Sequence, residues 1–427
     1  MSILKDQKKI LYIHYYFPPV GTIGTIRNYN MAKQLSRHFS QSFLISVKHK
    51  PFLLDELFET DFIERFEVEN YDYRWFLSLS TFGEISRARN YKSYPFTRFL
   101  IRLADSYPFN QFIGEGGWMY IQHAVKLASK LISKHKITHI YSSFRPTADH
   151  VIASKLKRKY PHLIWIADFR DLPVDNNRKN TIFPALQDNY HKQLIQSTDY
   201  VLTVSEGLKK KLDTYHPNVL LVRSGLHELI KPLDSGDAPE KFTLSYTGSI
   251  YKDHQDIKAL LKAIKCLLDE HLINPVKFEL IYAGMDKYWW EKQLVDHGLE
   301  MIGNNKELLS LTESIKIQHR SHINILLSWS GPFTTGVLTG KLYEYLAAGK
   351  PILCLVNGMK DTEMELLFDQ IHAGKVFYNF QSDLIKCWIL DYYTMWEQTG
   401  QVIFEMNKLA LKDFEWERTT RVITEKI

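Results

Sequence analysis

The sequence predicts an α/β protein built from two doubly wound domains. Its 427 residues exceed what one hydrophobic core usually organises. With 45% hydrophobic and 24% charged residues, the composition is that of an ordinary globular protein. Apolar runs of strand length alternate with segments of helical period, which is the pattern of βαβ units in parallel sheets. We therefore expect two parallel sheets, each with helices on both faces.

The first domain is expected over residues 1–226. Its strands are short apolar runs followed by turn or polar residues, and its helices have apolar residues three and four positions apart. The expected strands are 9–16, 42–48, 137–143, 163–168, 200–205 and 219–224. The expected helices are 25–38, 118–134, 147–159 and 206–215.

The second domain is expected over residues 242–405, after a linker at 227–241 that loses periodicity and gathers Pro, Gly and Asp. Its expected strands are 242–248, 277–284, 323–329 and 351–356, with helices over 255–270 and 288–295 and another opening near Gly340. The carboxyl end of the chain is expected to be mostly helical.

A segment at about 70–117 breaks the alternation, because aromatic and basic residues crowd together there. It can be an insertion folded onto the first domain with its aromatics packed inward. It can also be an amphipathic lip, over about 85–112, that contacts lipid headgroups as a peripheral membrane surface. The basic residues of this lip are Arg87, Arg89, Lys92, Arg98 and Arg102, beside Phe96, Phe99, Leu100 and Leu103.

Charge and cysteine usage narrow the class of partner. The net charge of +6 comes from 54 basic and 48 acidic residues, which suits phosphorylated ligands or an anionic membrane and does not imply nucleic acid.

Cys266, Cys354 and Cys387 each lie in an apolar run, so we expect buried, reduced thiols and a cytoplasmic protein, with contact at the inner membrane face as an option. Neither a metal-ligand spacing nor a nucleophile elbow occurs.

The stretch "TGKLYEYLAAGKPIL" (339–353) is the strongest candidate for a ligand site. It follows an expected strand and a loop containing Gly331 and Gly336, and ligands of open parallel sheets bind beyond the carboxyl ends of strands. Thr339 and Gly340 open a helix whose free N–H groups suit an anion. Lys341 and Glu344 share one face of this helix, either to bind a diphosphate and a ribose or as an ordinary surface pair at i,i+3.

Two further loops that contain glycine are also candidates for a ligand site. Gly21 and Gly24 precede the first helix, in a GxxG spacing that equally suits a plain tight turn. Gly248 and Ser249 end the first strand of the second domain, and Lys252 follows, either to reach a phosphate or as an exposed lysine.

The segment "WIADFRDLP" places Asp168, Arg170 and Asp171 directly after a strand. Two carboxylates flanking a guanidinium can form a structural ion-pair network. They can also position a sugar hydroxyl or stabilise positive charge at an anomeric carbon.

Taken in order from Ile10 to Val356, these stretches, with "YSSFRPTADHVIASKL" and "STDYVLTVSEGLKKKL", resemble family 4 retaining glycosyltransferases of the GT-B architecture. The resemblance implies two facing Rossmann-like domains and a carboxyl-terminal helix, within 406–427, that crosses back to the first. It also implies a nucleotide-diphosphate sugar donor bound without a metal, with Glu344 on the ribose. The diphosphate would lie between the strand end at Gly248 and the loop before Lys341.

On the acceptor side, the resemblance places the segment matching 167–171 near the transferred sugar, with Asp168 or Asp171 as the candidate. The acceptor would be a hydroxyl of a glycan or lipid-linked molecule, in surface polysaccharide or glycolipid assembly. The family often has a second glutamate where this chain has Gly336. A non-catalytic nucleotide-sugar-binding relative or scaffold, and a nucleotide-sugar epimerase of the same architecture, therefore stay as alternatives.

Overall fold

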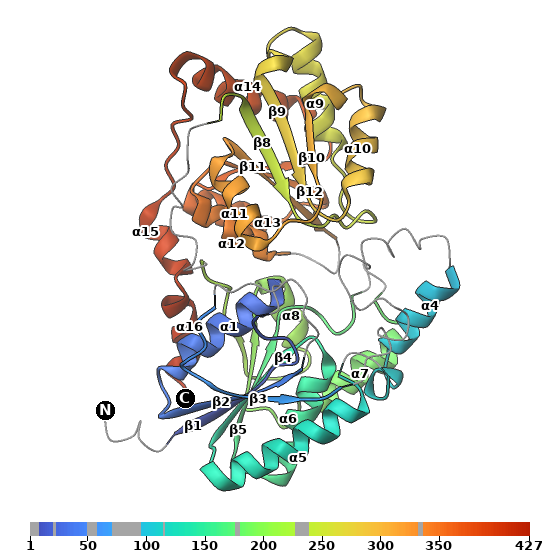
Figure 1. Cartoon of the computed structure of the whole chain (residues 1–427), viewed down its shortest axis with the longest axis vertical. Helices are drawn as coiled ribbons and strands as arrows, with labels where there is room; N and C mark the ends of the chain where they lie inside the picture. Colours follow the sequence, from blue (N-terminus) through green and yellow to red (C-terminus); the bar gives the residue numbers. More distant parts are fainter. Residues whose placement is uncertain are drawn as a thin grey trace. The chain divides into compact units, whose positions relative to one another are not determined.

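The computed structural model describes residues 8–19, 23–48, 58–70, 95–113, 116–175, 180–226, 239–331 and 336–427. Gly21, most of the expected linker and the part of the aromatic segment at 71–94 lie outside the described residues. The chain divides into two compact units (Figure 1). Unit 1 comprises Met1–Arg223 and Trp416–Ile427, and unit 2 comprises Ser224–Glu415.

Unit 1 is built on a parallel sheet of seven strands in the order β3-β2-β1-β4-β5-β6-β7. The strands are β1 (Lys9–Ile13), β2 (Gln41–Val47), β3 (Glu64–Val68), β4 (His139–Phe144), β5 (Ile164–Phe169), β6 (Tyr200–Thr203) and β7 (Val219–Leu221). The strands that follow β1 are added first on one side of it, as β2 and β3, and then on the other side, from β4 to β7. The strand order therefore reverses between β1 and β4, and doubly wound sheets bind ligands at such a reversal.

Helices cover both faces of this sheet. Their bounds are α1 (Ile23–Ser36), α4 (Pro95–Ala104), α5 (Trp118–His135), α6 (Thr147–Lys159), α7 (Pro184–Leu194), α8 (Glu206–Leu212) and α16 (Trp416–Thr424). Alternate residues of β1 point to opposite faces, so Leu11 packs in the core formed by α5 and α6, and Tyr12 in the core formed by α1 and α16. The carboxyl-terminal helix α16 thus returns to unit 1 and contacts α1.

Unit 2 repeats the arrangement with six parallel strands in the order β10-β9-β8-β11-β12-β13. The strands are β8 (Phe242–Thr247), β9 (Phe278–Ala283), β10 (Gly303–Lys306), β11 (Ile323–Ser330), β12 (Ile352–Gly358) and β13 (Gly374–Tyr378). The helices are α9 (Lys258–Asp269), α10 (Lys287–Asp296), α11 (Leu311–Arg320), α12 (Gly340–Ala348), α13 (Thr362–Ile371), α14 (Ser382–Thr399) and α15 (Lys408–Leu411). The cores on the two faces involve α9, α10 and α14 on one side and α12 and α13 on the other.

The predicted fold class is confirmed, and several elements were missed. Strands β3 and β10 lie at sheet edges and have the sequences ERFEV and GNNK, which lack the continuous apolar run of a central strand.

The expectation of three buried thiols is wrong for two of them: Cys354 is buried in β12, whereas Cys266 and Cys387 are exposed on α9 and α14. Within the described residues, no helix is long and apolar enough to cross a membrane.

Candidate functional site

A polar cluster lies at the carboxyl edge of the unit 2 sheet, where the strand order reverses between β8 and β11. Strand β8 is followed directly by Gly248, and β11 leads through a loop into α12. Parallel sheets of this kind bind ligands at this position, because the two loops diverge there and leave a crevice. The structure therefore brings together two of the loops that the sequence singled out.

Lys341 and Glu344 of α12 are both buried, with 9% and 8% of their surface exposed. Their neighbours Leu342 and Tyr345 are fully buried and fix the rotation of the helix against the sheet. Burial lowers the pKa of Lys341, although Glu344 and Asp286 act to raise it. Burial likewise raises the pKa of Glu344, against the lowering effects of Gln318 and Lys341. An ordinary surface pair is therefore the wrong description of these residues.

The carboxylate of Glu344 is oriented by Gln318, a residue that the sequence analysis missed. Gln318 lies on α11, and its Nε2 donates to Glu344 Oε2 at 2.8 Å and to Thr247 Oγ1 at 2.9 Å. Its Oε1 is buried and has no hydrogen-bond partner among the described residues. A carboxylate beside an unsatisfied amide oxygen gives two acceptors, which suits a ligand that presents adjacent hydroxyl groups.

Lys341 packs against the strand end at Gly248. Its Nζ lies 5.3 Å from the centre of the Tyr246 ring, within cation–π range. Gly248 has a φ of +120°, and a Cβ built there would lie 2.7 Å from Lys341 Nζ. A side chain at residue 248 would displace the end of Lys341, so glycine allows the loop after β8 to pack closely against the first turn of α12.

Lys252 forms an ion pair instead of standing free in solvent. Its Nζ lies 2.9 Å from Asp286 Oδ1, and Asp286 Oδ2 accepts a hydrogen bond from the backbone N–H of Ile250 at 2.9 Å. Asp286 was not singled out from the sequence. The carbonyl of Ser249 accepts a hydrogen bond from Tyr246 Oη at 2.7 Å, which ties the loop back to its own strand.

The described part of the loop before α12 provides no side-chain cap for the first N–H groups of the helix. Thr339 is the N-cap residue, but its side chain caps no backbone N–H group. Its Oγ1 is buried and lacks a hydrogen-bond partner within the part of the chain that the structure describes. The first turn of α12 carries no acidic residue. Since an uncapped helix start attracts negative charge, Thr339, Gly340 and Lys341 form a site suited to an anion.

Gly336 lies at a bend in this loop, with a φ of +66°. Its N–H donates to Asp361 Oδ2 at 3.0 Å. The adjoining residues 332–335, which include Thr334 and Thr335, lie outside the described residues.

In unit 1, Asp168 is fully buried and forms a bidentate ion pair with Arg27 of α1. Arg27 Nε donates to Oδ2 at 2.8 Å and Nη2 to Oδ1 at 2.7 Å. Asp168 therefore forms a structural ion pair, but its partner is Arg27, which the sequence analysis did not consider, and not the neighbouring Arg170. Asp171 is only partly buried, so between the two acidic candidates it is the one with surface open to a ligand.

Arg170 lies between the first loop and the end of β4. Its Nη2 donates to the carbonyl of Arg145 at 3.3 Å, and a Cβ on Gly24 would collide with its guanidinium. Burial lowers the pKa of Arg170, while Asp171 and Asp168 act to raise it. Gly24, which lies in the first turn of α1 and not in the loop before the helix, therefore allows the close approach of Arg170.

His14, directly after β1, is a third residue that the sequence analysis missed, after Gln318 and Asp286. It is fully buried and stacks between Tyr12 and Phe17. Burial lowers its pKa to about 3, with Asp168 acting to raise it and Arg170 to lower it. Burial therefore favours the neutral form of the ring.

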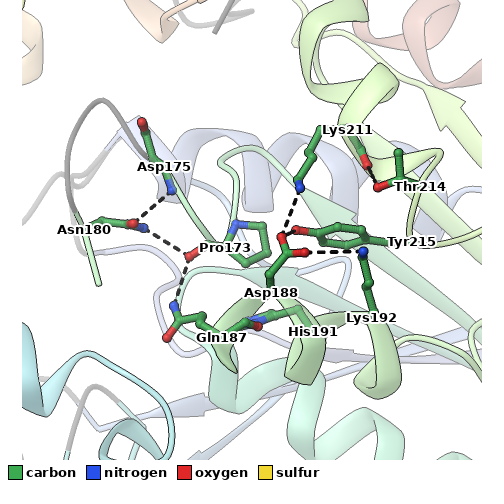
Figure 2. A network of polar contacts seen from close by, with 10 residues as sticks. All are labelled: Pro173, Asp175, Asn180, Gln187, Asp188, His191, Lys192, Lys211, Thr214 and Tyr215. Atoms are coloured by element: carbon green, nitrogen blue, oxygen red, sulfur yellow. Dashed lines mark hydrogen bonds and ion pairs between the residues drawn. The ribbon is translucent and has the colours of Figure 1, made fainter. Parts of the chain in front are cut away.

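The chain after Asp171 is anchored to α7 by the polar network of Figure 2. The carbonyl of Pro173 accepts from Gln187 Nε2 at 2.9 Å and from Asn180 Nδ2 at 3.1 Å. These bonds are buried or partly buried, so they hold Pro173 and Asn180 against α7.

Asp188, the residue after Gln187 in α7, makes a second group of contacts with α8 and the segment after it (Figure 2). It accepts a hydrogen bond from Tyr215 and pairs with Lys211 at 3.1 Å and Lys192 at 3.4 Å. Burial acts to raise the pKa of Asp188, but the hydrogen bonds from Tyr215 and Lys211 hold it below its usual value. These contacts join α7 to α8 and to the segment after it, so we interpret the cluster as structural.

Among the described residues, no group of three or more His, Cys, Asp or Glu side chains is arranged to hold a metal ion. The positive charges near the unit 2 site come from Lys341, Lys252 and the start of α12.

No family model matches the chain, and no curated protein sequence matches it. Solved structures match along nearly the whole chain. A glycosyltransferase from Rickettsia africae ESF-5 has 14% identity, covers 98% of this chain and 97% of its own, and gives a TM-score of 0.59. Sucrose-phosphate synthase from Thermosynechococcus elongatus has 11% identity, 96% coverage of both chains and a TM-score of 0.62.

The lipopolysaccharide outer core galactosyltransferase WaaB has 12% identity, covers 98% of this chain and 100% of its own, and gives a TM-score of 0.57. At sequence identities this low, structural similarity shows the fold alone. The fold class is α/β with two doubly wound parallel sheets. Its architecture is GT-B, as in these structures, which confirms the fold that the motif resemblance implies.

Proposed function

We propose that the protein is a glycosyltransferase that moves a sugar from a nucleotide-diphosphate sugar to a hydroxyl acceptor, with retention at the anomeric carbon. The observation that carries this proposal is the buried trio of Lys341, Glu344 and Gln318 at the reversal point of the unit 2 sheet. The GT-B fold of the chain supports the same class.

The electrostatics of α12 explain why an anion belongs there. A cation in the first turn opposes the helix dipole by a few tenths of a kcal/mol, and burial of Lys341 adds a desolvation cost. A diphosphate beside Lys341 and the free N–H groups of the first turn would remove both penalties. The two phosphates of the donor are therefore proposed to lie between Gly248 and the start of α12.

The ribose would lie one turn further along the same helix. Glu344 and Gln318 Oε1 are hydrogen-bond acceptors, and the 2′ and 3′ hydroxyls of a ribose are donors. Binding there would satisfy the buried amide oxygen that the protein itself leaves unpaired.

In the proposed reaction, the bond from the anomeric carbon to the diphosphate oxygen breaks and its electron pair leaves with the nucleoside diphosphate. The acceptor oxygen forms the new bond to the anomeric carbon, and its proton passes to the departing diphosphate oxygen. Lys341 and the start of α12 would stabilise the charge that grows on the departing diphosphate, so this step needs no metal ion. On the acceptor side, Asp171 and Arg170 are proposed to face the transferred sugar, while Asp168 holds Arg27.

A lipid-linked or glycan acceptor, in surface polysaccharide or glycolipid assembly, is proposed together with peripheral membrane contact. Unit 1 exposes a cluster of large apolar side chains, here called the aromatic patch. Its members are Phe99, Leu100, Phe109, Phe112, Ile113, Trp118, Phe183 and Leu186. Among the described residues of unit 1, Val422 is the only other exposed large apolar side chain.

The patch is one continuous piece of structure, because hydrogen bonds join its two segments. Ser106 Oγ accepts from the N–H of Ile182 at 2.9 Å, and Arg102 Nη2 donates to the carbonyl of Thr181 at 3.2 Å. Residues 85–112 contain five basic residues and one acidic residue. In the proposal, this basic segment and the exposed aromatic side chains contact an anionic lipid surface together.

The test of the proposed function is turnover of UDP-, ADP- and GDP-sugars by the full chain, measured as release of nucleoside diphosphate. We expect Glu344→Ala to lower kcat/KM for donor hydrolysis about 10- to 100-fold, because hydrogen bonds to charged groups are worth about 1.5–3 kcal/mol. Glu405→Ala, at a side chain 75% exposed, is the control and should leave the rate unchanged.

Two outcomes would replace the proposal with its alternatives. An epimer of the donor sugar that accumulates without acceptor would indicate an epimerase. Nucleotide-sugar binding without any turnover would indicate the non-catalytic relative that Gly336 keeps open.

A further inference from the structure

Asp361, whose Oδ2 accepts the N–H of Gly336, is a fully buried carboxylate. It follows β12 and is the N-cap residue of α13, where Oδ1 accepts from the N–H of Met364 at 3.1 Å. Its own N–H donates to Tyr378 Oη at 3.1 Å, and Tyr378 donates in turn to Glu365 at 2.8 Å. The carboxylate is therefore held in one orientation by β13 and α13.

The second carboxylate oxygen reaches across to the loop before α12. Oδ2 accepts from the N–H of Gly336 at 3.0 Å, and this bond is buried. Gly336 has a φ of +66°, and its carbonyl accepts from the N–H of Leu338 at 2.9 Å. The bend that begins at Gly336 ends at Thr339, where α12 starts. One oxygen of Asp361 thus caps α13, and the other fixes the approach to α12.

We propose that Asp361 is a positioning residue for the donor diphosphate. By holding Gly336, it sets the place of Thr339, Gly340 and Lys341, whose N–H groups and charge are proposed to receive the phosphates. This inference rests on the proposed function and adds a residue that touches neither substrate nor reacting atoms.

The same geometry explains why glycine occupies position 336. A residue with a Cβ is strained at a φ of +66°, whereas the hydrogen bond to Asp361 excludes only proline, which lacks the N–H. A glutamate at this position would therefore have to change the loop. In this chain the carboxylate at the bend comes from Asp361, on a different loop.

A plain capping role is the competing explanation, and Asp361→Asn separates the two. Asparagine caps helices about as well as aspartate, so its oxygen can keep the bond to Met364. Its amide nitrogen then faces Gly336 and cannot accept the N–H of that residue. Asn407→Ala is the matched control, because Asn407 caps α15 by accepting from Leu409 and Ala410 and its backbone N–H bonds the far end of α13 at Ile371.

The experiment is calorimetric titration of the full chain with UDP, ADP and GDP and with the corresponding monophosphates, together with thermal melting. For the diphosphate that wild type binds most tightly, we expect Asp361→Asn to raise Kd at least ten-fold and the monophosphate Kd less than three-fold, in a variant that still melts cooperatively. Asn407→Ala should lose stability and keep both affinities.

An unchanged diphosphate Kd in Asp361→Asn would overturn the positioning role. An equal loss of diphosphate affinity in Asn407→Ala would also overturn it, because the effect would then be general destabilisation. If wild type bound no nucleoside diphosphate, the proposed function itself would fail, and the inference with it.

Discussion

At the scale of single residues, the site depends on buried groups whose partners are distant in sequence. Asp168 is separated by 141 residues from Arg27, its ion-pair partner. The sequence places Asp168 at the end of a strand but contains no signal that α1 will deliver an arginine there. For this reason, the choice between Asp168 and Asp171 stays open in the sequence, and the structure favours Asp171 as the accessible carboxylate.

Gly248 provides a residue-scale prediction, because its missing side chain makes room for Lys341. Gly248→Ala should weaken nucleoside diphosphate binding, since the new methyl group would displace the Lys341 ammonium. It should also cost about 1–3 kcal/mol of stability through strain at positive φ. Titration with UDP, ADP and GDP and denaturant unfolding measure the two effects.

Gly400→Ala is the control for strain alone. Gly400 also has positive φ, at +71°, and a Cβ there meets nothing within 4 Å. It should lose comparable stability and bind nucleotide normally. Wild-type affinity in a folded Gly248→Ala variant would show that Lys341 does not need its present position.

At the scale of elements, α12 was predictable and α11 was missed. The helix start at Gly340 and its left-handed end at Gly349 could be read from the sequence. Helix α11 has few apolar residues, and its buried face includes Gln318 and His319. The one signal for it was the capping box from Ser310 to Glu313, which the structure contains with both hydrogen bonds.

The aromatic patch gives an element-scale prediction. Phe112 and Trp118 are 64% and 57% exposed, so Phe112→Ser combined with Trp118→Ser should not disturb the core. We expect this variant to lose at least ten-fold in affinity for vesicles containing phosphatidylglycerol, because each aromatic side chain buried in lipid contributes about 1.5–3 kcal/mol. Sedimentation with vesicles measures the binding.

Phe380→Ser is the matched control, since Phe380 is 75% exposed on unit 2. It should leave vesicle binding unchanged. Equal binding by wild type and the patch variant, or equal binding to neutral phosphatidylcholine vesicles, would contradict contact with an anionic membrane.

At the scale of the whole molecule, alternation of strands and helices was enough to predict two doubly wound sheets. The central strands carry continuous apolar runs because both of their faces are covered, and this signal is strong. Edge strands such as β10 carry no such signal. The return of the last helix to unit 1 came from the family resemblance, because its amphipathic face alone does not specify which surface it covers.

The most direct test of the central claim is titration of the full chain with a ribonucleoside diphosphate and with its 2′,3′-dideoxy analogue. If Glu344 binds the ribose hydroxyls and Lys341 the diphosphate, wild type should bind the ribonucleotide at least ten-fold more tightly, and Glu344→Ala should bind both ligands equally. The claim would be contradicted if wild type bound neither ligand, or if Glu344→Ala kept the full preference for the ribonucleotide.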